Sequence, residues 1–110
     1  MRSRYFIRVA GEVVATVHLT GVVGYRFWWV GKVFVKKKYR STGFGTTIMK
    51  AVAEVADGEG VTLKLRIHPT GDLTVRQLAA WYRRLGFVRH GGTWTRKPKK
   101  EDQNEKKRTG

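Results

Sequence analysis

A glycine-containing turn joins an apolar run at residues 27–35 to a helix-like run at residues 44–56. The turn reads Arg-Ser-Thr-Gly-Phe-Gly at residues 40–45. The first amides of a helix have no intrahelical acceptor, and the helix dipole places partial positive charge beside them. Because Gly43 and Gly45 lack a Cβ atom, their backbone can approach a ligand closely. The pattern favours a site for a phosphate-bearing ligand, with an ordinary loop as the alternative interpretation.

The spacing of the glycines separates this turn from two other phosphate-binding motifs. No Gly-Lys-Ser/Thr follows after four residues, as a Walker loop requires, and the three glycines of the dinucleotide fingerprint are absent. Basic residues just upstream add positive charge, namely Lys36, Lys37, Lys38 and Arg40. A pyrophosphate-bearing ligand would fit such a turn.

Two segments resemble motifs of the GNAT superfamily of N-acetyltransferases. Residues 33–45 resemble motif A, in which an apolar strand end and a short Tyr-Arg loop lead into Arg/Gln-x-x-Gly-x-Gly/Ala at a helix start. Residues 81–87, Trp-Tyr-Arg-Arg-Leu-Gly-Phe, resemble the end of motif B, Tyr-x-x-x-Gly-Phe. The motifs occur in the family order with a strand-like run between them. The resemblance covers roughly residues 5–96.

The resemblance implies that acetyl-CoA is the cosubstrate and that an acetyl group moves directly to an amine. It implies that the backbone of Phe34 and Val35 pairs with the pantetheine arm, as an added strand does at a sheet edge. Tyr82 matches the family tyrosine often assigned as the general acid, and packing in the core is its alternative role. The implied pyrophosphate-binding residues are Arg40, Ser41, Thr42, Gly43, Phe44, Gly45 and Thr46.

The general base is less well defined than the acid. The strand-like run at residues 27–35 has no carboxylate. His68 is the best-placed titratable group, because sites open at the carboxyl ends of strands and a neutral imidazole can accept a proton at pH 7. The alternatives are a solvent-facing His68 and a water relay; His18 and His90 are weaker candidates. The family asparagine seven residues before the motif B tyrosine is Val75 here, so one pantetheine contact is in doubt.

Hydrophobic periodicity predicts a single α/β domain. Alternating patterns indicate strands at residues 5–10, 13–20, 27–35 and 61–68 and a closing hairpin of 87–90 with 93–96, and helical spacing indicates helices at 44–56 and around 78–85. A strand–helix–strand connection implies a parallel crossover. The expected fold is therefore a GNAT-like mixed, mostly antiparallel sheet with a central β-α-β crossover and helices packed on the sheet.

The run at residues 27–35 is apolar on both of its expected faces, which suggests a central strand. Regular alternation puts Phe27, Trp29 and Val33 on one face, and Trp28 and Val30 on the other. The family normally has a further strand and two helices before this region, whereas about four residues precede the first expected strand here. A bare apolar face usually marks an interface, so a homodimer is expected.

Composition adds a strong positive charge. The 110 residues include 23 Lys and Arg against 8 Asp and Glu, a net charge of +15, and no cysteine. No apolar run is long enough to cross a membrane and no signal pattern opens the chain, so a cytoplasmic protein is expected. A basic protein concentrates anions such as coenzyme A, nucleic acid or an acidic protein, unless its charge serves only solubility. The second functional hypothesis is therefore a GNAT-fold module with weak or no catalysis that binds nucleic acid or an acidic protein.

Residues 1–96 are expected to form the acetyltransferase domain, and residues 97–110 a basic disordered tail. The tail has almost no apolar side chains to offset the entropy lost on ordering. Truncation after Arg96 should therefore leave the Tm within a few degrees in a calorimetric scan, although binding to a polyanion can weaken. A large fall in Tm would show that the tail docks on the domain.

Overall fold

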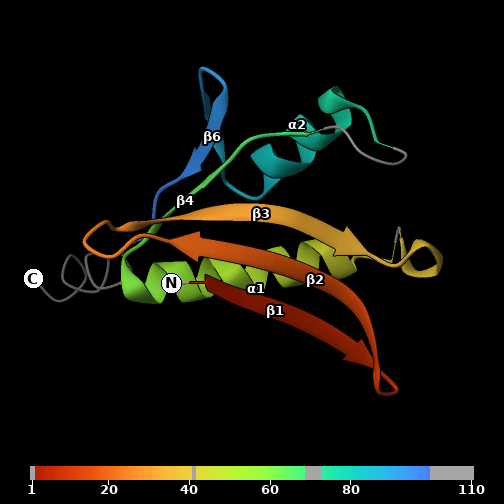
Figure 1. Cartoon of the computed structure of the whole chain (residues 1–110). Helices are drawn as coiled ribbons and strands as arrows, with labels where there is room; N and C mark the ends of the chain where they lie inside the picture. The colour runs from red at the N-terminus through yellow and green to blue at the C-terminus, as the bar shows by residue number, and fades with distance from the viewer. Residues whose placement is uncertain (1, 41, 69–72, 100–110) are drawn as a thin grey trace, which may run out of the picture.

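A computed structural model describes residues 2–40, 42–68 and 73–99 of the chain. Within these ranges the chain forms six strands, two α-helices and one short 3₁₀ helix (Figure 1). The strands are β1 (Arg2–Val9), β2 (Glu12–Gly21), β3 (Phe27–Val35), β4 (Thr62–Leu65), β5 (Val88–His90) and β6 (Thr93–Arg96). The helices are η1 (Lys37–Tyr39), α1 (Phe44–Glu59) and α2 (Val75–Arg84).

The six strands of the described residues form one sheet in the order β1-β2-β3-β4-β6-β5. β3 and β4 pair in parallel, and every other neighbouring pair is antiparallel. α1 connects the two parallel strands. The expected mixed sheet with a central β-α-β unit is therefore confirmed, and so is the central position of β3.

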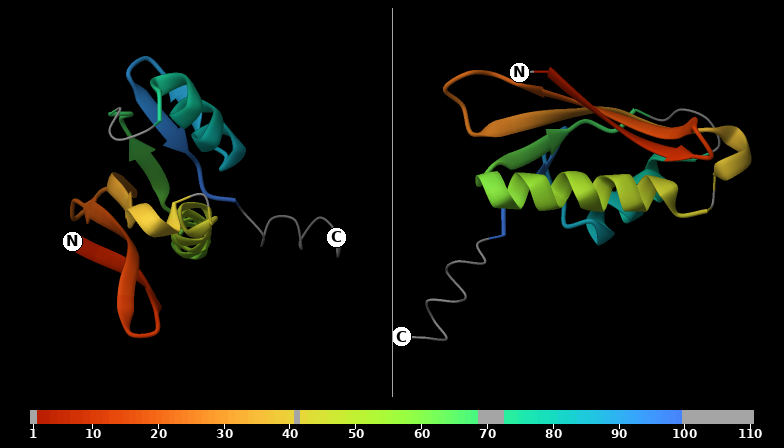
Figure 2. Two further views of the ribbon diagram at one scale, coloured as in Figure 1. Left: turned by 90° about the vertical axis from the view of Figure 1, so that its right-hand side faces the viewer. Right: turned by 90° about the horizontal axis from the view of Figure 1, so that it is seen from below.

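Both helices pack on the same face of the sheet (Figure 2). Apolar residues at helical spacing bury one stripe of each helix, because a helix presents positions three and four apart on one side. α1 buries Ile48, Met49, Val52 and Ala56, and α2 buries Ala79 and Tyr82. These side chains join buried residues of β2, β3, β4 and β6 in a single core cluster.

α1 ends three residues later than the sequence pattern suggests. The pattern places the end at Ala56, whereas the helix continues through Glu59. Gly60 is the residue that closes it, with a left-handed φ of 68° that glycine adopts without strain. The N–H of Val61 then donates to the carbonyl of Ala56 at 2.8 Å. Thus Gly60, and not the preceding Gly58, supplies the stop.

β3 contains one more residue than the stretch of β2 opposite it. Val17 pairs with Val33 and Leu19 pairs with Val30, so the pairing advances two residues on β2 and three on β3. An extra residue of this kind is a β-bulge, which bends the strand and reverses the alternation of its side chains.

The bulge decides which side chains of β3 reach the core. Val33 and Val35 pack against the same core cluster as Trp28. The sequence-based expectation that Val33 shares a face with Phe27 and Trp29 is therefore wrong, because regular alternation does not continue through a bulge.

β3 and β4 are paired along only part of their length. Three residue pairs join positions 27–29 to positions 62–64, and β4 then ends at Leu65. β3 continues to Val35, past its bulge. The strand expected at residues 61–68 is consequently shorter, because its ladder with β3 stops where β3 bends away. Residues of β3 and residues that follow β4 line a pocket where the two strands separate.

Arg96 connects β6 to the ends of both helices. Its side chain is only 6% exposed, and its guanidinium donates two hydrogen bonds to the carboxylate of Asp57, at 2.8 and 3.1 Å. Its Nε donates to the carbonyl of Leu85 at 3.2 Å. The hydrogen bonds from Arg96 hold the pKa of Asp57 below its usual value. A buried charge needs such a partner, and Asp57 supplies it.

The start of the expected tail contacts the domain. The backbone N–H of Lys99 donates to Oδ1 of Asp57 at 2.8 Å. The polypeptide is therefore attached to the end of α1 as far as Lys99, three residues beyond the expected domain boundary. Residues 100–110 lie outside the described residues.

Replacement of Asp57 by Asn should lower the free energy of unfolding by roughly 3 kcal/mol at pH 7, since Arg96 would remain buried without a counter-ion. Because the folded-state pKa of Asp57 is lowered, its stabilisation is complete above the unfolded value near 3.8 and is lost as the pH falls through the folded pKa. The difference in free energy of unfolding between wild type and Asp57→Asn should therefore disappear in acid. Urea titrations across pH 2–7 test this, with Glu54→Gln, at an exposed site on the same helix, as the control. A gap that stays constant with pH would contradict the prediction.

Candidate active site

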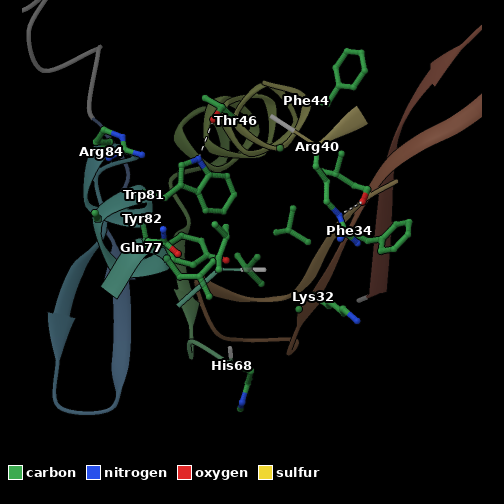
Figure 3. A pocket seen from close by; sticks show the side chains of 18 of the residues that line it. Lys32, Phe34, Arg40, Phe44, Thr46, His68, Gln77, Trp81, Tyr82 and Arg84 are labelled. Atoms are coloured by element: carbon green, nitrogen blue, oxygen red, sulfur yellow. Dashed lines mark hydrogen bonds between the residues drawn. The ribbon is translucent and has the colours of Figure 1, made fainter. Parts of the chain in front are cut away.

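A cavity of about 1150 Å³ lies between β3, the start of α1 and the inner side of α2 (Figure 3). β3 lines it from Trp29 to Val35, including the bulge. α1 contributes its first turn, and α2 contributes several side chains including Trp81 and Tyr82. The turn and the motif B segment, well separated in the sequence, therefore meet in one pocket. None of the described lining residues is an aspartate or a glutamate.

The first turn of α1 lies at one end of this pocket. Gly43 is the N-cap residue, with a left-handed φ of 89°. The first intrahelical hydrogen bond runs from the N–H of Thr47 to the carbonyl of Gly43, at 2.9 Å. The amides of residues 44–46 therefore precede the helical ladder, and no acidic residue occupies the first turn. Such an end attracts anions.

The basic residues before the turn are less free than the sequence suggests. Lys36 forms an ion pair with Glu12 at 2.5 Å, and Lys38 lies 3.7 Å from the same carboxylate. The hydrogen bond from Lys36 lowers the pKa of Glu12. Arg40 donates from Nε to the carbonyl of Val35 at 3.1 Å. Part of the positive charge expected at the turn therefore has a partner within the chain.

The implied pyrophosphate-binding residues fall on this end of the pocket. Arg40, Gly43, Phe44, Gly45 and Thr46 line the cavity, and Thr42 stands next to them with its hydroxyl bonded to the carbonyl of Tyr39. Ser41 lies outside the described residues. Phe34 and Val35, the residues implied to contact pantetheine, line the β3 wall of the cavity.

Tyr82 lies in the interior of the pocket wall. Its side chain is 9% exposed and packs between Trp81 and Phe87, with ring centroids 4.8 and 5.6 Å away. Burial raises the pKa of Tyr82 to about 12, because a phenolate is poorly solvated in such surroundings. The phenol is consequently protonated throughout the neutral range and can act as a proton donor.

A hydrogen bond joins the two helical walls of the pocket. The indole Nε1 of Trp81 donates to Oγ1 of Thr46 at 2.9 Å (Figure 3). A Cβ atom added at Gly45 would lie 3.5 Å from the Trp81 ring, an ordinary contact, so Gly45 allows the ring to lie close without being strictly required. Trp81 belongs to the motif B segment, but its spacing in the sequence gives no sign of a bond to Thr46, which lies 35 positions away.

His68 reaches only the edge of the pocket. It follows β4 after an unpaired stretch, its side chain is exposed, and Figure 3 shows it pointing away from the centre of the cavity. His18 and His90 are exposed and do not line the pocket. The structure thus brings Tyr82 and the α1 amides together, while His68 remains peripheral.

Val75, at the position of the motif B asparagine, does not line the pocket. It is the first residue of α2 and is 51% exposed. Gln77, two positions later, does line the cavity. Its Oε1 accepts the N–H of Thr74 at 2.8 Å, and Thr74 Oγ1 accepts the N–H of Gln77, which together form a capping box. The capping pattern Thr-x-x-Gln is a sequence signal that could have located this start of α2.

Two further features bear on the site. Among the described residues, no group of three or more His, Cys, Asp or Glu side chains is arranged to hold a metal ion. None of the helices in the described ranges is both long and apolar enough to cross a membrane.

Comparison with solved structures shows which fold surrounds this pocket. The ribosomal-protein-S18-alanine N-acetyltransferase of Escherichia coli superposes with a TM-score of 0.76 at 16% identity, covering 87% of this chain and 68% of that one. An aminoglycoside 6′-N-acetyltransferase in complex with coenzyme A superposes with a TM-score of 0.71 at 15% identity, covering 87% of this chain and 72% of that one. PaiA N-acetyltransferase of Thermoplasma acidophilum, also in complex with coenzyme A, superposes with a TM-score of 0.67 at 13% identity, covering 87% of this chain and 60% of that one. At these identities the likeness establishes the fold.

Sequence comparison gives the family independently of the fold. No curated protein sequence matches the chain. The profile of the acetyltransferase (GNAT) domain, however, matches residues 2–89, which include the glycine turn, β3 and the motif B helix. The chain therefore belongs to the GNAT acetyltransferase family.

Proposed function

We propose that this protein is an acetyl-CoA-dependent N-acetyltransferase that moves an acetyl group to an amine of an unidentified acceptor, with a macromolecule as one candidate. The observation that carries the proposal is a single pocket with an anion-attracting helix end at one side and a protonated phenol in its wall. Family membership and the coenzyme A complexes of similar folds support it.

The residues at the start of α1 fit the diphosphate of coenzyme A. The amides of residues 44–46 precede the helical ladder, and Gly43 has open space where a Cβ would stand. The first turn has no acidic side chain that would repel a phosphate. The exposed Lys37 and Arg40 lie immediately upstream and add positive charge. Phe34 and Val35 would offer backbone groups to the pantetheine arm along β3.

Acetyl-CoA would supply the acetyl group as a thioester. Tyr82 would donate a proton to the departing sulfur, since its phenol keeps that proton at neutral pH. Deprotonation of the incoming amine falls to His68 or to a water relay, because the described lining residues include no carboxylate. The exposed, peripheral place of His68 favours a water relay that ends near this imidazole.

Gly43→Val should reduce the affinity for acetyl-CoA by at least tenfold, because a β-branched residue strains a φ of 89° and crowds the helix end. Gly11→Val is the matched control. Gly11 also has a left-handed φ, of 80°, with open space around it, but it lies in the β1–β2 turn away from the pocket. Calorimetry should show the loss only for Gly43→Val, with both variants folded by circular dichroism. Equal affinity in the two variants would remove the turn from the binding site.

Tyr82→Phe should lower kcat by about 10²–10⁴-fold while leaving the Kd for acetyl-CoA unchanged, because the ring is kept and only the proton donor is lost. The acceptor is first identified by mass spectrometry after acetyl-CoA is incubated with a panel of amines and peptides. Tyr5→Phe, on β1 and outside the pocket, removes a phenol elsewhere and should keep full kcat. Full kcat in Tyr82→Phe would exclude the acid role and leave water or His68 as the donor.

A further inference from the structure

The face of the sheet opposite α1 and α2 carries a continuous row of side chains across all six strands. Residues directly opposite each other in a ladder point to the same face. The pairings therefore align, on one face, Arg2, Thr20, Trp29, Lys64, Thr95 and Val88. No helix of the described residues packs on this face, which is turned toward the viewer in Figure 1 with α1 behind the strands.

Aromatic rings on this face are paired with cations. Phe6 on β1, which is 46% exposed, has the guanidinium groups of Arg4 and Arg8 at 5.5 and 5.7 Å from its ring centroid. Lys64 lies 4.3 Å from the ring of Phe27, and Arg66 lies 5.6 Å from that of Trp29. We call these seven residues the open sheet face: Arg4, Phe6, Arg8, Phe27, Trp29, Lys64 and Arg66.

The charge of the open sheet face has no acidic counterpart among the described residues. Glu54, Asp57 and Glu59 lie on α1, on the other side of the sheet. Glu12 has its carboxylate paired with Lys36. Four cations and three aromatic rings therefore share one uncovered surface. A partner that matches both must carry repeated negative charge and planar apolar rings.

We propose that the open sheet face binds single-stranded nucleic acid, with bases stacking on the rings of Phe6, Phe27 and Trp29 and phosphates lying near the flanking cations. Stacking platforms interleaved with basic residues bind single strands with little sequence preference, because every base offers a flat face. A second copy of this chain fits less well, since two such faces would bring arginine against arginine. An acidic polypeptide would satisfy the charge but leave the rings unused.

This proposal does not rest on acetyl transfer. Trp29 and Arg66 also line the pocket, but Arg4, Phe6, Arg8, Phe27 and Lys64 do not. Variants at these five positions therefore separate nucleic-acid binding from acetyl-CoA binding.

The test uses the full chain and fluorescently labelled oligomers of about 12 nucleotides in anisotropy titrations. Single-stranded RNA and single-stranded DNA should bind, with affinity falling steeply between about 50 and 200 mM salt. An abasic strand of the same length, a duplex and polyglutamate should each bind with an affinity at least about tenfold lower, because they offer charge without accessible bases. The RNA and DNA arms show which strand is preferred.

Variants then separate stacking from charge. Phe6→Leu combined with Phe27→Leu keeps apolar volume but removes two rings, and should weaken single-strand binding about tenfold or more while leaving abasic-strand binding unchanged. Lys64→Gln should weaken both and reduce the salt slope by about one. Lys50→Gln, exposed on α1, is the charge-matched control and should have little effect. Calorimetry with acetyl-CoA and thermal melts check that each variant is folded.

Three results would overturn the proposal. One is equal affinity for the single strand, the abasic strand and polyglutamate, which would indicate attraction by charge alone. Another is an equal loss of affinity in Lys50→Gln and Lys64→Gln, because binding would then not be localised. The third is a dimer in sedimentation that the Phe6→Leu and Phe27→Leu changes dissociate, which would make this face a contact between copies of the chain.

Discussion

The extra residue in β3 between Val30 and Val33 sets the shape of the whole site. Before the bulge, β3 pairs with β4 and contributes Trp28 to the core. The ladder with β4 ends at Trp29, and after the bulge Val33 and Val35 turn toward the core instead. Within the described residues, no backbone pairing between β3 and β4 continues past Trp29, and the residues of β3 from Trp29 onward line the pocket. The start of α1 and the side of α2 then complete walls around a gap that the sheet itself leaves open.

The buried pair of Arg96 and Asp57 holds the other end of the domain. Ion pairs of this kind contribute little net stability compared with apolar packing, since both charges are removed from water. The two side chains must nevertheless keep their relative positions, because the loss of either one leaves a buried charge without a partner. Arg96 reaches Asp57 at the end of α1 and Leu85 at the end of α2. The two helices that form the pocket walls are therefore fixed relative to β6 at the end remote from the glycine turn.

Much of this organisation could be predicted from the sequence, and the features that could not be predicted have identifiable physical reasons. Periodicity located all six strands and both helices, because burial imposes a regular spacing on apolar residues. The glycine turn located the helix end that lines the pocket. The bulge escaped prediction, since one inserted residue leaves alternating apolar residues on both sides of it. The Lys36–Glu12 and Trp81–Thr46 pairs escaped as well, because they join residues that only the folded chain brings together.

The hydrogen bond from Trp81 to Thr46 has a further consequence for the pocket walls. A neutral hydrogen bond of this kind contributes only about 1 kcal/mol net. Trp81 also packs against the core cluster, so this bond fixes where the indole lies on the wall and does not by itself hold the two helices together. A ligand that displaced either helix would have to break the bond and change the surroundings of the Trp81 indole, one of the four tryptophans of the chain.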